Sequence, residues 1–204
     1  MSPFLWHGGL MLLAWFVLLP GGALVARFFK VLPGQDFPAV RDSRAWWRAH
    51  LLLQYAGSAV AAAALWMAWD ALDGVWDWSE PHAVCGAAVM ALCALQVASG
   101  LLRGTKGGPT DTRANPATWR GDHYDMTLRR RLFEGWHKRA GYAAIVLAIP
   151  TAWLGGQLVG APLWAGLLLL AVVAGFVAVF LVLTWRGHWM NTWAAIWGPP
   201  GYAR

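Results

Sequence analysis

The chain has 204 residues, of which 58% are hydrophobic and only 13% are charged. A soluble domain carries about twice that share of charged residues, so this composition excludes a substantial soluble domain and favours a membrane protein. The net charge of +6 does not indicate nucleic-acid binding, because the basic residues lie between apolar stretches, where they orient a protein in the membrane.

Charge-free stretches predict the membrane-spanning helices. Asp, Glu, Lys and Arg are absent from residues 1–26, 49–69, 81–102 and 140–185. One span needs about 20 residues, so the first three stretches hold one helix each and the last holds two, separated by a turn near residues 155–162. We predict an all-α membrane protein with five transmembrane helices, over residues 6–29, 48–70, 82–103, 137–158 and 162–185. They form one domain over residues 1–186, followed by a cytoplasmic interfacial tail over 187–204.

The ends of the chain and its loops set the expected orientation. The first stretch has no basic residue before it and no small-residue cleavage site after it, so we expect a retained helix rather than a signal peptide. Alternating spans place all 16 Lys and Arg on one face of the membrane and four acids of the 70–80 loop on the other. The positive-inside rule then predicts a periplasmic N-terminus and a cytoplasmic C-terminus, in a bacterial inner membrane. The basic 103–136 segment is predicted to be a loop with one short helix near 126–135.

Four histidines stand at the starts of four predicted helices. Helices 1 and 3 run in the same direction and begin with His7 and His82, whereas helices 2 and 4 run the opposite way and begin with His50 and His137. Each pair therefore shares a depth in the membrane, one near each face. A flat macrocycle between two helices needs one imidazole from each at the same depth, so the pattern favours two b-type haem sites with two histidine ligands each.

Neighbouring residues fit that interpretation. Gly86 and Gly141 follow His82 and His137 at i+4, on the same helix face, where the missing side chain lets a porphyrin approach the backbone. Gln54 follows His50 at i+4 and offers a hydrogen bond inside the membrane. Covalent c-type haem is excluded because the chain has no CxxCH motif. A closed zinc site is disfavoured because it needs four ligands and each histidine pair offers two. The alternative for each histidine is an interfacial side chain facing lipid headgroups.

The two other histidines and the two cysteines are predicted to have no cofactor role. His123 lies in a charged loop and is expected to be solvated. His188 follows the fifth helix and is expected to be an interfacial side chain, with contact to a quinone or a partner as the alternative. Cys85 and Cys93 lie in one apolar stretch and are expected to be small packing residues.

The order of these motifs resembles the transmembrane core of the cytochrome b561 family, of the type attached to DOMON domains. The matching residues are His7-Gly8, Trp15, Pro20, Gly22, Ala26-Arg27-Phe28 and Lys30 in the first helix, His50 and Gln54 in the second, His82, Gly86 and Leu95-Gln96 in the third, and His137, Gly141 and Tyr142 in the fourth. The resemblance covers about residues 6–160. It is carried by the core alone, and we expect no DOMON domain before the first helix.

The resemblance implies a dihaem four-helix bundle with two non-covalent haem b groups, ligated by His7 with His82 and by His50 with His137. It implies electron transfer across the membrane from a donor on one face to an acceptor on the other. Arg27, Lys30 and Arg48 match or lie near the inner basic residues at which the family receives electrons from ascorbate. In a bacterial protein we expect a quinol or a redox partner protein instead of ascorbate.

Two alternatives remain open from the sequence. One is a non-catalytic accessory subunit of a respiratory or photosynthetic complex, including a pigment-binding form. The other is a haem- or quinone-dependent membrane anchor for a soluble dehydrogenase, contacted through the Trp-rich tail.

Overall fold

The computed structural model describes residues 2–32, 34–37, 43–103 and 128–191, and all regular structure within them is helical. The elements are α1 (Pro3–Leu13), η1 (Ala14–Leu18), α2 (Leu19–Phe28), α3 (Arg44–Ala71), α4 (Pro81–Leu102), α5 (Leu128–Leu158) and α6 (Leu163–Trp185). The first three form one continuous helix, so five helices are long and apolar enough to cross a membrane. The predicted all-α class with five spans is confirmed.

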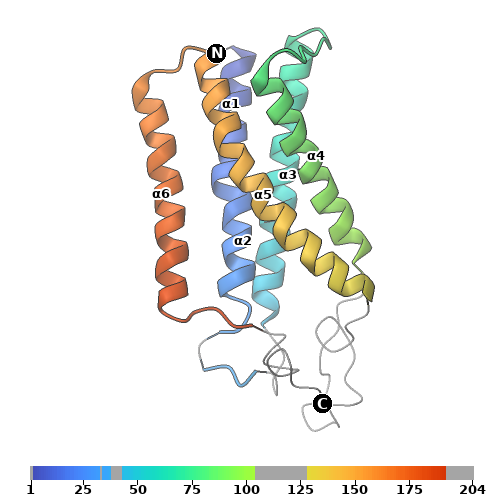
Figure 1. The fold of residues 1–204 in the computed structure, drawn as a ribbon, viewed down its shortest axis with the longest axis vertical. Helices are drawn as coiled ribbons and strands as arrows, with labels where there is room; N and C mark the ends of the chain where they lie inside the picture. The colour runs from blue at the N-terminus through green and yellow to red at the C-terminus, as the bar shows by residue number, and fades with distance from the viewer. Residues whose placement is uncertain (1, 33, 38–42, 104–127, 192–204) are drawn as a thin grey trace.

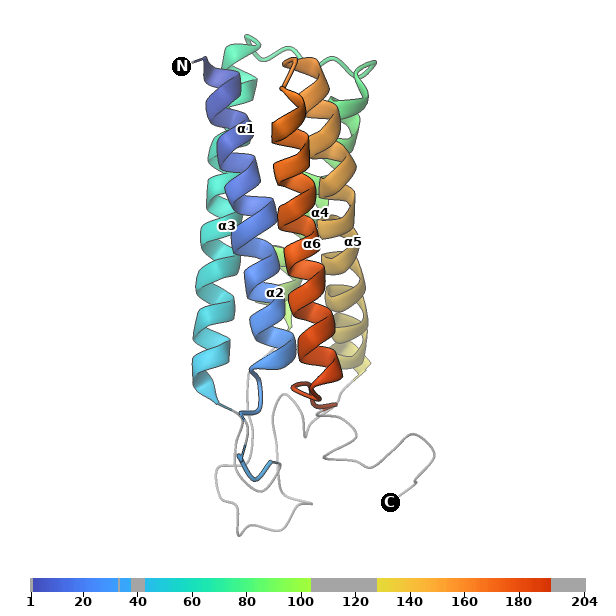
Figure 2. The same cartoon turned by 90° about the vertical axis from the view of Figure 1, so that its left-hand side faces the viewer.

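The helices form two halves that stand side by side, with α1, η1 and α2 packed on α3 in one half and α4 packed on α5 in the other. Successive spans alternate in direction, so α1 and α4 begin at the same end (Figure 1). We call this end the outer end and the opposite end, where α3 and α5 begin, the inner end. The fifth span, α6, lies on the outside of the bundle beside α2 (Figure 2), and none of its residues is buried.

A π-helical segment interrupts the first span. Pro20 has no backbone N–H, and its ring would clash with the Phe16 carbonyl in a regular helix. The chain widens over Ala14–Leu18, where the N–H of Leu19 reaches the carbonyl of Ala14, five residues back. This turn sets Trp15 and Phe16 into the core, with only 5% and 7% of their surfaces exposed. The prediction of a regular helix over 6–29 missed this segment.

Small residues hold the two helices of the first half together. Gly57, Ala61, Ala64 and Ala68 follow one another along one face of α3 and are all buried. An added Cβ on Gly57 would lie 2.9 Å from the Leu19 side chain, so the two backbones approach closely there. Such seams of small residues are the usual way in which membrane helices pack. The seam brings the carbonyl of Ala64 to the outer end of α1.

The fourth span begins earlier than predicted. We expected a short helix near 126–135 and a separate span from 137, but α5 is continuous from Leu128 to Leu158. Glu134 joins the segments, because it pairs with Arg130 at 3.3 Å and with Lys138 at 3.0 Å, each four residues away. Such pairs support a helix across a charged stretch, which a search for charge-free stretches divides. His137 therefore lies inside α5 and not at its start.

Charges separate between the two ends of the bundle. The described Lys and Arg residues all lie at the inner end or in the inner parts of the helices. The outer end of α3 and the loop that joins it to α4 carry acids only, namely Asp70, Asp73, Asp77 and Glu80. Ser79 donates its backbone N–H and its hydroxyl to Oδ1 of Asp77, at 2.8 and 2.6 Å. These hydrogen bonds lower the pKa of the Asp77 carboxyl, which keeps it negatively charged in mildly acidic solution.

Candidate functional site

The four predicted histidines lie as two pairs, and each pair bridges the two halves of the bundle. At the outer end, His7 of α1 faces His82 of α4, with ring centres 6.2 Å apart and ring planes at 90°. At the inner end, His50 of α3 faces His137 of α5, with ring centres 6.4 Å apart and planes at 74°. The structure therefore brings together the residues that the sequence paired by depth.

This separation suits one metal ion between two imidazoles. Two metal–nitrogen bonds of about 2 Å, with roughly 1 Å from each coordinating nitrogen to the centre of its ring, put the ring centres roughly 6 Å apart. Both pairs match that value. Among the described residues, no group of three or more His, Cys, Asp or Glu side chains could hold a metal ion. The pairs therefore fit a metal whose other ligands come from a macrocycle, as in haem.

Hydrogen bonds fix the orientation of three of these rings. Nδ1 of His7 lies 2.8 Å from the carbonyl oxygen of Ala64, Nδ1 of His82 lies 2.9 Å from that of Thr151, and Nδ1 of His50 lies 3.0 Å from that of Gly22. A carbonyl only accepts, so each Nδ1 carries the proton and donates it. The opposite atom, Nε2, is then left with a lone pair for a metal.

The fourth ring has side-chain partners. Nδ1 of His137 lies 3.4 Å from Oγ of Ser99 and 2.6 Å from the side-chain amide of Gln96, both on α4. Each histidine is thus held by the other helix of its own half and faces a histidine of the opposite half. Sequence reasoning noted Gln96 and Gly22 as parts of motifs but gave neither a role, and it missed Ala64 and Thr151. A backbone acceptor leaves no mark on residue identity.

The predicted glycine and glutamine positions lie beside the pairs. An added Cβ on Gly86 would meet nothing nearer than the Thr151 side chain at 3.9 Å, and one on Gly141 would lie 3.8 Å from the Gln96 amide. Gln54 donates from Nε2 to the carbonyl of Leu19 at 2.9 Å. An added Cβ on Gly22 would run into that amide, so Gly22 leaves the space that Gln54 occupies.

Aromatic rings and cations surround the inner pair. Trp46 and Trp47 lie 6.3 and 6.0 Å from the His50 ring, and Phe133 lies 4.9 Å from the His137 ring. Arg103 lies over the Trp47 ring at 3.9 Å. The buried Arg130 lies 5.0 Å from the centre of the Phe133 ring. The inner pair therefore sits in a positively charged, aromatic environment, whereas the neighbouring loop at the outer end is acidic.

The three cations predicted to form a donor site point in different directions. The Arg27 guanidinium lies 4.9 Å from the Phe180 ring of α6 and 5.5 Å from the Trp189 ring. Lys30 Nζ lies 5.3 Å from the Trp46 ring, and Arg48 is exposed on α3. Arg27 is therefore turned toward α6, and Arg48 is the exposed member of the set.

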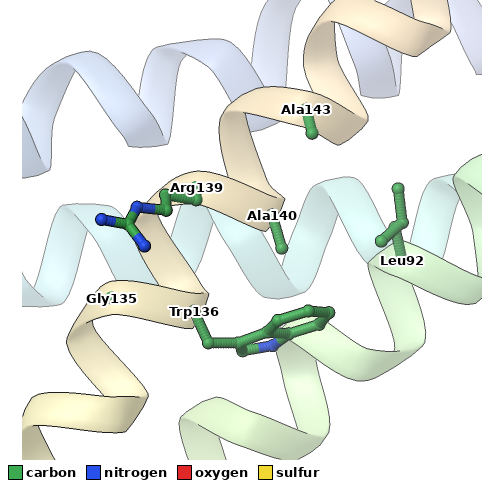
Figure 3. Close-up of a pocket in the computed structure, with 6 residues that line it drawn as sticks. All are labelled: Leu92, Gly135, Trp136, Arg139, Ala140 and Ala143. Carbon is green, nitrogen blue, oxygen red and sulfur yellow. The ribbon is translucent and has the colours of Figure 1, made fainter.

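A shallow groove of about 420 Å³ runs between α4 and α5, lined by Leu92, Gly135, Trp136, Arg139, Ala140 and Ala143. The Trp136 ring reaches toward α4, and Arg139 extends away from the apolar floor (Figure 3). Trp136 and Ala140 flank His137 along α5, so the groove adjoins the inner pair.

Of the two remaining histidines, the structure describes only His188. His188 is exposed just beyond α6. His123 and the tail from residue 192 onward lie outside the described residues.

Comparison with known proteins identifies a family and several related chains. The family described as eukaryotic cytochrome b561 matches residues 6–161. A mouse protein, ferric-chelate reductase 1, is 32% identical over 155 residues, which are 76% of this chain and 22% of that protein. Human ferric-chelate reductase 1 is 28% identical over 180 residues, which are 87% of this chain and 27% of that protein.

A plant relative carries DM13 and DOMON domains in its name besides cytochrome b561. The cytochrome b561, DM13 and DOMON domain-containing protein of Arabidopsis thaliana is 27% identical over 154 residues, which are 76% of this chain and 14% of that protein. The chain thus spans between 14% and 27% of the length of these relatives. No solved structure matches the chain.

Proposed function

Because the chain belongs to the cytochrome b561 family, and is therefore a membrane-spanning, b-type haem protein of electron transfer, we propose that it carries electrons across the membrane through two haem b groups. His7 and His82 would hold the outer haem, and His50 and His137 the inner one. The observation that carries this proposal is the repeated geometry of the two pairs, with ring centres 6.2 and 6.4 Å apart. The Nδ1 atoms of His7, His50 and His82 support it further, because they donate to backbone carbonyls and so leave Nε2 available for iron.

The depth of the two pairs suits transfer in two steps. His82 and Gln96, which reach the outer and inner pairs, are fourteen residues apart on α4, or about 21 Å along the helix axis at 1.5 Å per residue. A hydrocarbon core is about 30 Å thick, so the pairs would lie toward its opposite sides. Dividing the crossing between two sites shortens each step.

The residues between the pairs keep water out. The buried core contains Trp15, Phe16, Val89, Cys93, Ala144 and Ala148, all at depths between the two pairs. When bound, haem iron supplies one-electron chemistry by alternating between its ferric and ferrous states. The protein's own part is to orient four imidazoles and to surround them with a dry, apolar core.

The charges of the bundle favour a direction for the partners. We place the donor at the basic inner end, where Lys30 and the exposed Arg48 would attract an anionic donor; Arg27 has the weaker claim because it faces α6. A quinol would instead enter from the lipid, through the groove beside His137. We place the acceptor at the acidic outer end, which suits a positively charged partner. The positive-inside rule puts the inner end in the cytoplasm and the N-terminus on the opposite side.

A spectroscopic count of haem tests the proposal. The purified protein in detergent is reduced with dithionite, its difference spectrum is recorded, and its haem is quantified as the pyridine haemochrome. Two haem b groups per chain are expected. One group would contradict the dihaem arrangement, and none in a folded sample would remove the electron-transfer role.

Transport across the membrane needs a second experiment. The protein is reconstituted in liposomes that enclose a reductant, with a membrane-impermeant ferric acceptor outside. Reduction of the external acceptor should require the protein, and a His50→Ala variant should abolish it. Equal rates in protein-free liposomes would contradict transmembrane transfer.

A second candidate function follows from α6. This helix is the most apolar span, and its residues are largely exposed. An exposed apolar helix suits contact with another membrane subunit as well as with lipid, which favours a role as the haem-bearing subunit of a larger complex. Purification from native membranes in mild detergent tests this role, because a stable partner subunit would co-purify in fixed stoichiometry.

A further inference from the structure

Three aromatic rings flank the inner histidine pair, and a cation lies over each of them. The ring centres lie 4.9 to 6.3 Å from that of His50 or His137. The cations lie 3.9 to 5.3 Å from the ring centres, with Lys30 over Trp46, Arg103 over Trp47 and Arg130 over Phe133. We call Lys30, Arg103 and Arg130 the inner cations. Each of them is one aromatic ring away from a histidine of the inner pair.

The inner cations come from three different helices and converge on this pair. Lys30 follows the end of α2, Arg103 is the C-cap residue of α4, and Arg130 belongs to the first turn of α5. Arg130 is only 8% exposed, so salt in the solvent screens its charge little. Glu134 is the carboxylate that pairs with Arg130 and Lys138. Its single negative charge leaves this group of residues with a positive net charge.

The outer pair has the opposite surroundings. In the described part of the chain, no Lys or Arg lies in the outer half of the bundle, and the loop between α3 and α4 carries acids. Glu80, the N-cap residue of α4, stands two residues before His82. The N-terminus of α4 adds about half a positive charge near His82, which is less than the full negative charge of Glu80. The charges of the protein therefore make the outer site the more negative of the two.

We propose that the inner cations give the inner haem a more positive reduction potential than the outer haem, and this inference rests on the proposed dihaem function. Reduction adds a negative charge at the iron, which nearby cations stabilise and nearby acids oppose. Both pairs offer the same two imidazole ligands, and haem b brings its own carboxylates to either site. The charges of the protein therefore distinguish the two sites.

The order of the two potentials decides where a single electron rests. With the inner haem more positive, the first electron that the protein takes up stays at the inner site, beside the proposed donor. The outer haem becomes reduced only after the inner one. The protein thus keeps one electron in reserve on the donor's side and passes the next one outward.

A potentiometric titration of the purified protein in detergent measures both midpoints. His82→Ala leaves only the inner haem and His50→Ala only the outer one, so the two variants assign the components. Arg103→Gln removes an inner cation, and the inner midpoint should become more negative, whereas Arg103→Lys keeps the charge and should restore it. Glu80→Gln should make the outer midpoint more positive. Arg186→Gln is the matched control, because Arg186 is exposed at the end of α6.

In the wild-type protein the inner midpoint should be the more positive one, and each charge variant should shift one component only. Equal midpoints, or a more positive outer midpoint, would overturn the inference, as would an unchanged inner midpoint in Arg103→Gln. A purely structural role would lower the haem content of Arg103→Gln and Arg103→Lys alike. If Arg103→Gln does not retain two haems, Lys30→Gln takes its place with the same expected shift.

The proposed function fails in a different way. A wild-type protein with fewer than two haems would contradict the dihaem arrangement itself. Two haems whose midpoints do not follow the charges would leave that arrangement intact, so the two failures are distinguishable.

Discussion

The Nδ1 atom of His82 lies 2.9 Å from the carbonyl oxygen of Thr151, and Gly155 follows one turn later on the same helix. An added Cβ on Gly155 would lie 2.7 Å from Cε1 of His82 and 3.0 Å from its Nδ1. α5 therefore holds the α4 ligand of the outer pair in two ways, through a hydrogen-bond acceptor and through a gap that only glycine leaves.

Gly155→Ala should weaken the outer haem site specifically. The new methyl group overlaps the His82 ring, which must turn away from Thr151 and lose its hydrogen bond. Loss of an outer-shell partner costs about 10- to 100-fold in metal affinity, so the outer haem should be retained poorly during purification while the inner haem stays. Gly156→Ala is the neighbouring control, because its Cβ would meet only Ala161 at 3.6 Å. Full haem content in Gly155→Ala would show that the ring does not need this space.

Removal of a single histidine ligand should lower the haem content from two groups per chain to one. We expect His82→Ala to lose the outer haem and His50→Ala to lose the inner one, each giving one haem per chain by pyridine haemochrome. His188→Ala should keep both, because His188 is exposed beyond α6. Loss of both haems from either single variant, with the fold intact by circular dichroism, would argue against two independent sites.

Gly57→Ala should destabilise the first half of the bundle. Its Cβ would lie 2.9 Å from the side chain of Leu19, in the seam where α3 meets the first span. Overpacking of this kind costs about 1–3 kcal/mol, so the thermal transition of the detergent-solubilised protein should fall. Gly175→Ala on α6 is the control, since nothing lies within 4 Å of its added Cβ. An unchanged transition in Gly57→Ala would mean that the helices separate at little cost.

The spans and the histidine pairs could be predicted because both leave a direct pattern in the sequence. A span requires about 20 apolar residues, and depth follows from position along alternating helices, so His7 could be paired with His82 and His50 with His137. Features that depend on side-to-side packing leave no such pattern. The backbone acceptors of Ala64 and Thr151 and the role of Gly155 became visible only when the helices were placed against one another.

Errors at element boundaries have equally physical causes. Charged residues normally end a span, so the sequence predicted that the fourth would begin at His137; the ion pairs of Glu134 neutralise part of that charge and let α5 continue from Leu128. Arg27 was grouped with Lys30 and Arg48 because Arg27 and Lys30 match the inner basic residues of the family and Arg48 lies close to them in the sequence. The rings of Phe180 on α6 and of Trp189 just beyond it are remote in sequence, and they hold Arg27 toward α6.

The groove between α4 and α5 allows a test of a quinol donor. Ala143→Phe should fill the groove, which Ala143 lines together with Leu92 and Trp136. If a quinol delivers electrons there, the rate of haem reduction by a soluble quinol should fall while haem content and reduction by dithionite stay unchanged. Val177→Phe, at an exposed position on α6, is the control. Equal quinol rates in the two variants would exclude the groove as the entry site.

Arg27 should anchor α6 rather than bind the donor. Its guanidinium lies within 5.5 Å of the Phe28, Phe180 and Trp189 rings, and its buried Nε has no hydrogen-bond partner among the residues that the structure describes. A cation–π contact contributes about 0.5–2 kcal/mol, more where it is desolvated. Arg27→Gln should therefore increase hydrogen exchange at the inner end of α6, about 2- to 30-fold for that range of energies. Arg186→Gln, exposed at the end of α6, is the control.

Arg48→Gln should instead raise the KM for an anionic donor without changing exchange in α6. If Arg27→Gln raised that KM and left α6 protected, Arg27 would belong to the donor site after all.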